Sequence, residues 1–172
     1  MANHGIVRTD LMYGTDVREG LVSVKYMGDN GSTPTAIDNG NVLSVTALQT
    51  GEREIYVGAA VAANTAINDV VLIASPEVMY DERLRNLEDF YNEAGKACRG
   101  YRLHSGDIFS VTKDALAGAS TPAVGDVVEL AAGTKLSVVA AATGATSGST
   151  VVGKILAIDI VGRYTYYAVK VD

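Results

Sequence analysis

The sequence predicts a mainly β protein, a small β-barrel or sandwich with one short helix in the middle of the chain. Most of the 172 residues fall into short apolar or alternating runs, which is the pattern of strands. Gly, Asn and Asp repeatedly separate these runs, and glycine alone contributes 18 residues. These residues favour tight turns. Several short strands separated by turns are typical of all-β barrels and sandwiches.

The first part of the chain contains four expected strands. Residues 21–27 alternate between two faces and end at a Gly-Asp-Asn-Gly turn. Residues 42–48 and 54–61 form the next two runs. Residues 70–74 are short and wholly apolar, so we expect a central strand that is buried on both faces.

One helix is expected over residues 81–93. Leu84, Leu87 and Tyr91 recur at the spacing of a single helical face, and Gly95 is a suitable stop. An extended segment packed along a barrel is the alternative interpretation of this stretch.

The last third returns to strands. Residues 115–122 are a connection of mostly small residues, and residues 140–150 are uncharged and low in complexity. We expect the latter to be a flexible loop at the tip of a hairpin. The expected strands are 108–112, 126–130, 135–141, 151–160 and 164–171.

These assignments divide the chain into four segments. Whether the two β-rich parts form one barrel or two stays open at this point. The expected segments are an N-terminal arm (1–18), a β-rich N-terminal subdomain (19–78), a helical or extended connector (79–104) and a C-terminal β-barrel (105–172).

Composition excludes several classes of protein. The net charge of −6 argues against nucleic-acid binding, which normally requires a basic surplus. No run of 18 apolar residues is present, so we expect no membrane span. The first ten residues lack the apolar core of a secretory signal. The single cysteine, Cys98, excludes an intramolecular disulfide and is expected to be a small buried residue.

No motif in the sequence predicts an enzyme, a cofactor site or a metal site. Residues 104–107 bring His, Ser and Asp together, but a catalytic triad is assembled from separate elements, and a turn explains this stretch better. Residues 148–154 match the spacing of a phosphate-binding loop up to its lysine. The next residue is Ile155, where the motif requires a hydroxyl group.

The final segment is rich in tyrosine. Tyr164 and Tyr166 are expected on one face of a strand and Tyr167 on the other. Tyrosine is favoured at interfaces because it combines an apolar ring with a polar tip. It also serves in sugar binding or in ordinary cross-strand packing, so these interpretations remain open.

Three C-terminal stretches resemble the small β-barrel of head decoration (capsid cement) proteins of tailed bacteriophages. They are residues 121–130, which contain Pro-Ala-Val-Gly-Asp-Val-Val, then 152–157 (Val-Gly-Lys-Ile-Leu-Ala), and the closing strand 167–171. Residues 94–112 are also similar to phage virion proteins of this kind. The resemblance extends over about residues 70–172 and implies a β-barrel without catalytic groups.

The resemblance implies a protein made in the host cytoplasm that binds the outer surface of the capsid and stabilises it. The implied partners are the major capsid protein and further copies of this chain, as a trimer on the shell. The arm, 2–18, could add a strand to a capsid sheet. A tail-tube subunit and a carbohydrate-binding adhesion module are the alternatives. Expected interface residues are Ile6, Arg8, Met12, Tyr13, Arg83, Arg85, Tyr101, Tyr164, Tyr166 and Tyr167.

Overall fold

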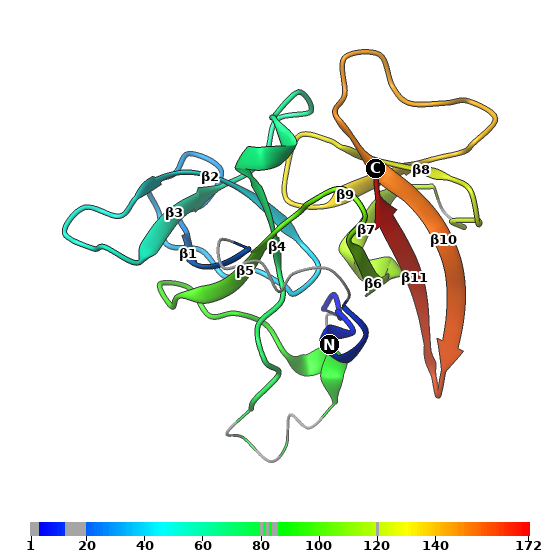
Figure 1. Ribbon diagram of the computed structural model, residues 1–172. Coiled ribbons are helices and arrows are strands. Elements are labelled where there is room, and N and C mark those ends of the chain that lie inside the picture. Colours follow the sequence, from blue (N-terminus) through cyan, green and yellow to red (C-terminus); the bar gives the residue numbers. More distant parts are fainter. Residues whose placement is uncertain (1–3, 13–19, 80, 82, 84–85, 120) are drawn as a thin grey trace.

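A computed structural model of the chain describes residues 4–12, 20–79, 81, 83, 86–119 and 121–172 (Figure 1). The fold is mainly β, as the sequence predicts, with eleven strands in the described residues. The helical segments in this part of the chain are 3-10 turns of three residues each. The strands form a closed barrel and a separate six-stranded sheet.

The barrel is built by five strands in the order β1-β3-β2-β4-β5. β1 pairs with β3 in parallel and with β5 in antiparallel orientation, and this second pairing closes the barrel. Closure leaves these strands without a free edge, because each one has two neighbours. The strands are β1 (Leu21–Tyr26), β2 (Val42–Leu48), β3 (Ile55–Ala59), β4 (Val70–Ile73) and β5 (Cys98–Arg102).

The remaining strands form an open sheet in the order β6-β11-β10-β8-β9-β7. β8 lies between β9 and β10, so the loop over residues 140–150 crosses from one side of β8 to the other. The expectation that this loop is the tip of a hairpin was therefore wrong. The strands are β6 (Ile108–Thr112), β7 (Leu116–Gly118), β8 (Val127–Leu130), β9 (Leu136–Val139), β10 (Val151–Val161) and β11 (Tyr164–Val171).

Where residues 81–93 are described, the expected helix is present only as the short 3-10 turn η3 (Leu87–Asp89). Asn86 and Asp89 cap this turn reciprocally. The chain then runs on without helical structure, and Asn92 forms a bridge with Ile37. Leu87 stays 37% exposed, so it contributes little of the buried face that stabilises an amphipathic helix. Leu84 lies outside the described residues.

Two strands fall where the sequence indicated none. β5 lies within the expected connector 79–104, and β7 lies within the expected small-residue connection 115–122. β5 contains a central glycine and two arginines, so it lacks an apolar alternation. It is a strand because β1 and β4 both pair with it.

The barrel and the sheet share a hydrophobic core. Val42 and Leu72 from the barrel pack in one cluster with Phe109 and Leu130 from the sheet. A second cluster lies within the barrel. It includes Val71 and Ile73, which alternate along β4 with the residues of the first cluster. β4 is thus buried on both faces, which confirms the expectation for residues 70–74.

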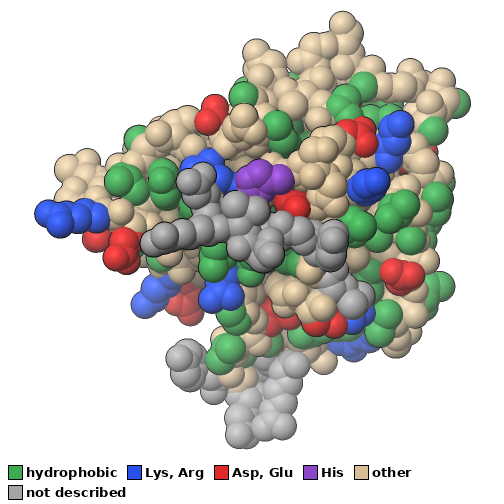
Figure 2. Space-filling view, viewed as in Figure 1, with side chains coloured by type: hydrophobic (Ala, Val, Ile, Leu, Met, Phe, Trp, Pro, Cys, Tyr) green, Lys and Arg blue, Asp and Glu red, His purple; other side chains and the backbone are tan. Residues whose placement is uncertain are grey.

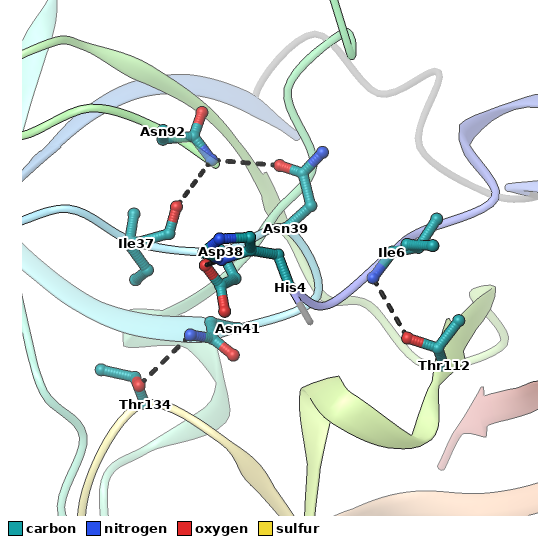
Figure 3. A network of polar contacts seen from close by, with 9 residues as sticks. All are labelled: His4, Ile6, Ile37, Asp38, Asn39, Asn41, Asn92, Thr112 and Thr134. Atoms are coloured by element: carbon teal, nitrogen blue, oxygen red, sulfur yellow. Dashed lines mark hydrogen bonds and ion pairs between the residues drawn. The ribbon is translucent and has the colours of Figure 1, made fainter. Parts of the chain in front are cut away.

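Polar contacts join the N-terminal segment to Asp38 before β2 and to Thr112 of the sheet, and Asn41 beside the barrel to Thr134 (Figure 3). The buried Asn39 amide donates to the Ser75 carbonyl over 2.9 Å and accepts from the Ser75 N–H over 2.9 Å. Asn92 also donates to Asn39, over 3.1 Å. His4 Nδ1 lies 2.7 Å from Asp38 Oδ1. These bonds satisfy polar groups that would be costly to bury without partners.

Candidate interaction surface

The β10–β11 hairpin projects from the rest of the molecule (Figure 1, orange and red). β8 pairs with β10 only from Val151 to Lys154, and Ile155 bonds through its backbone to Gly125 and Asp126. From residue 156 to residue 161, the only neighbour of β10 among the described strands is β11. One edge of β10 is therefore unpaired over six residues.

The side chains along this free edge are mostly apolar and exposed. Figure 2 shows hydrophobic side chains gathered along the right-hand side of the molecule, where Figure 1 places the hairpin. Patches of this kind mark interaction sites when they occur on a native surface. The hairpin surface, as we define it, consists of Leu156, Ile158, Ile160 and Val161, which are 50%, 39%, 77% and 47% exposed.

Two positions in β10 set the shape of the hairpin. The pairing of β10 with β11 shifts register between Ile155 and Ala157, so Leu156 is the extra residue of a β-bulge. Such bulges bend a strand and increase its twist. At Gly153 a Cβ atom would lie 1.9 Å from the Lys170 carbonyl oxygen. Only glycine fits where β10 approaches β11 so closely.

The other face of the hairpin carries tyrosines and an ion pair. Arg163 Nη2 lies 3.0 Å from Glu88 Oε1, and its guanidinium carbon lies 5.0 Å from the centre of the Tyr164 ring. The Tyr164 and Tyr166 rings tilt against each other with their centres 6.2 Å apart. Arg8 covers the Tyr166 ring at 5.5 Å. The β11 side of the hairpin is thereby packed against the N-terminal segment near the turn.

Three expected interface residues are not available at the surface. Ile6 and Tyr166 are each 2% exposed and Tyr167 is 8% exposed. Tyr167 belongs to the shared core, which explains its burial. Of the three tyrosines considered for sugar binding as an alternative, two are thus enclosed within the protein, and Tyr164 is partly exposed.

Most of the remaining expected interface residues are scattered over the molecule. Arg8 bonds to Asp10, and Arg83 bonds to Asp81 through Nη2 at 2.7 Å. Tyr101 lies on β5, and Met12 packs against the shared core. Arg8 is joined to Tyr164 through Tyr166, which both contact, whereas Arg83, Tyr101 and Met12 contact other parts of the molecule. Tyr13 and Arg85 lie outside the described residues.

The N-terminal arm pairs with its own chain where it is described. Val7 forms an antiparallel bridge with Val111 of β6. The Arg8 N–H donates to the Ser110 carbonyl over 3.0 Å, and the Thr112 N–H donates to the Ile6 carbonyl over 3.1 Å. Residues 6–8 therefore occupy the outer edge of β6 and are not free to extend a capsid sheet in this conformation.

The sequence stretches considered as possible catalytic or phosphate-binding motifs have structural roles. The Asp107 carboxylate accepts from the His104 N–H over 2.9 Å, so residues 104–107 form a turn, as expected. Ile155 lies within β10, so a strand and not a helix follows the phosphate-loop spacing. Burial raises the pKa of the Cys98 thiol to about 12, and Sγ donates to the Val24 carbonyl. In the described segments, no three His, Cys, Asp or Glu side chains are grouped to hold a metal ion.

Two buried carboxylates have roles that the sequence did not indicate. Asp126 accepts backbone bonds from Ala123 and Ala141, at 2.8 and 3.0 Å. Glu129 accepts from the Thr146 N–H over 2.8 Å. Both residues therefore anchor the loop over residues 140–150, which the sequence predicted to be flexible. An acid at a buried position of a valine-rich strand is the signal that could have indicated this role.

No family model, curated protein or solved structure matches this chain. None of the helical turns in the described residues is long enough to cross a membrane.

Proposed function

We propose that this protein is a structural component of a tailed-phage virion that binds the outside of the head and stabilises it. The proposal combines two observations of different kinds. Residues 121–130, 152–157 and 167–171 resemble capsid cement proteins. The same part of the chain carries the projecting hairpin surface.

The exposed apolar hairpin is the observation that carries the proposal. Complete burial of a Val, Leu or Ile side chain stabilises by about 1.5–3 kcal/mol. The four residues of the hairpin surface are about half exposed on average. Covering them would therefore contribute on the order of 4 kcal/mol. Such a surface suits an assembly contact better than the binding of a small polar ligand.

The proposed mechanism is bridging between capsid subunits. A protein that touches two or three subunits makes their separation cost its own contacts. The contact per copy need not be strong, because repetition over a shell multiplies its effect. The major capsid protein is the proposed partner, copies assemble as trimers on the shell, and no catalytic step is involved.

The copy number in virions from the source genome tests this function. We expect quantitative mass spectrometry to find the protein in near parity with the major capsid protein. A value of only tens to about a hundred copies per particle would identify a tail component and overturn the proposal. Absence from the particle would also overturn it.

Head stability provides the second test. Heads assembled without the protein should release DNA at a lower temperature than heads to which the purified protein has been added back. Ile160→Ser should weaken this rescue, since Ile160 is 77% exposed on the hairpin surface. Val78→Ser is the matched control, because Val78 is 65% exposed and lies outside the hairpin. Rescue that is equal for both variants would exclude the hairpin as the contact.

A further inference from the structure

We infer that the free edge of β10 pairs with the same edge of a second copy of this chain, antiparallel about a two-fold axis. This inference rests on the proposed function in one respect, because a subunit repeated over a shell needs contacts between copies. It adds the identity of the strand that covers residues 156–161 and the way in which the two strands meet.

Unpaired backbone groups are the first reason. Six residues of antiparallel strand extend about 20 Å, and pairing two such edges forms about six hydrogen bonds. This number is within the range of ordinary protein interfaces. The free edge of β7 spans only three residues, and the N-terminal arm covers β6. The β10 edge is thus the longest uncovered one among the described strands.

The pattern of side chains makes this edge complementary to itself. Asp159 is the only charged residue among the six. With Ile158 on the two-fold axis, Leu156 faces Ile160 of the second copy and Asp159 faces Ala157. Each exposed isoleucine then meets an apolar residue, and no like charges lie opposite each other, which would destabilise the pair. A shift of one residue would place Ile158 opposite Asp159.

The size of the hairpin surface determines the expected affinity of the dimer. Stable interfaces bury about 800 Å² on each partner, and four partly exposed side chains with one strand edge provide less than that. We therefore expect a reversible, concentration-dependent dimer in solution. A two-fold pair is also the commonest symmetry of homo-oligomers. On a shell, it would connect copies that belong to neighbouring trimers.

Analytical ultracentrifugation of the purified full chain tests the inference in the absence of capsids. The wild-type protein should shift from monomer to dimer between about 1 and 200 µM, a range that brackets micromolar affinity. Ile160→Lys should remain monomeric, because it places a charge within the apolar pairing. Val78→Lys changes a similarly exposed valine elsewhere, and it should form dimers like the wild type.

Cross-linking tests the register. Ile158→Cys would bring two thiols together across the axis, where opposite Cβ atoms lie about 4.5–5.5 Å apart. It should form a disulfide-linked dimer under mild oxidation faster than Val78→Cys. The native Cys98 is 5% exposed and does not compete. Equal thermal midpoints of variants and wild type would establish that each one folds.

Several outcomes would overturn the inference. They are a monomer at all concentrations, a trimer, or a dimer that Ile160→Lys leaves intact. The outcome is separable from that of the proposed function. A monomer that still binds heads would overturn the edge pairing and leave the cement role standing. A dimer that is absent from virions would support the edge pairing and overturn the cement role.

Discussion

The barrel and the open sheet differ in how the backbone groups at their strand edges are paired. Every barrel strand has two neighbours, so its backbone groups are paired around the ring. The open sheet has two edge strands. In addition, the outer half of β10 pairs with β11 on one side and with no described strand on the other. One end, β6, is covered by the N-terminal arm. The free edge of β10 has no such cover among the described residues.

This difference suggests that the barrel serves stability and that the free edge of the sheet serves assembly. A closed barrel cannot recruit another strand without opening, whereas an uncovered edge is ready to pair. The two units are joined by a shared core and by backbone hydrogen bonds from Val42 to Thr134 and from Val61 to Gly133. The hairpin surface projects from this shared core, so its exposed apolar residues lie away from the core.

The largest expected loss of stability comes from a substitution in the sheet, at the close approach of β10 and β11. Gly153→Ala places a methyl group against the backbone of Lys170, at 1.9 Å from its carbonyl oxygen. Since neither strand can move without disturbing the core, we expect the free energy of unfolding to fall by about 3 kcal/mol or more. Urea denaturation followed by circular dichroism would measure this loss.

Gly148→Ala is the control for that substitution. Gly148 has a φ of 85°, and a Cβ atom added there would have no neighbouring atom within 4 Å, so the substitution introduces only backbone strain. That strain costs about 1 kcal/mol. Equal losses for the two variants would contradict the role given to the close approach of β10 and β11.

The second prediction concerns the buried network that ties together the segments before β2, after β4 and before β5. Asn39→Ala removes a fully buried amide and leaves the Ser75 N–H, the Ser75 carbonyl and the Asn92 amide with fewer partners. Unsatisfied buried groups cost about 1–3 kcal/mol, and we expect a loss of about 2–3 kcal/mol. Asn30→Ala, in an exposed turn, should change stability by less than about 0.5 kcal/mol. Thermal unfolding would compare them.

The third prediction perturbs the barrel alone. A Cβ at Gly58 would lie 2.7 Å from methyl groups of Leu43 and Val24. These are side-chain atoms, which adjust more easily than a backbone carbonyl, so Gly58→Ala should cost about 1–2 kcal/mol. We expect no change in dimer formation, because the hairpin is untouched. A dimer that dissociates in this variant would contradict the separation of the two regions.

Much of the fold could be predicted from local patterns. The strands over residues 42–48, 70–74 and 164–171 follow apolar runs that the structure buries, at least in part. β5 could not be found in this way, because its sequence, Cys-Arg-Gly-Tyr-Arg, has neither alternation nor a run. Its conformation is determined by pairing with β1 and β4, which are distant in the sequence.

The candidate surface was harder to predict than the strands. Tyr166 and Tyr167 have the composition of interface residues, yet the arm and the core enclose them. Ile158 and Ile160 look like ordinary core residues, yet they are exposed because β8 ends before it reaches them. Exposure depends on which strands lie beside a residue, and strand order is a tertiary property that local patterns do not contain.

The smallest expected effect concerns the segment that leaves the barrel after β4. Burial raises the pKa of the Glu77 carboxyl above its usual value of 4.5, and the hydrogen bond from Asn39 opposes this shift. The native state therefore holds this proton more tightly than the unfolded state. Its contribution to stability is present at low pH and is lost as the pH rises from about 4.5 through the raised pKa.

Glu77→Gln removes this titration and should stabilise the protein at pH 7 relative to pH 4. Solvent screening keeps the gain below about 1 kcal/mol. Urea denaturation from pH 4 to pH 7 would measure the difference, and Glu52→Gln, at an exposed turn between β2 and β3, corrects for the change in net charge. The gain should leave dimer formation unchanged, because Glu77 belongs to the barrel side of the molecule and the free edge belongs to the sheet. A parallel change in both would show that the two regions are coupled through their shared core.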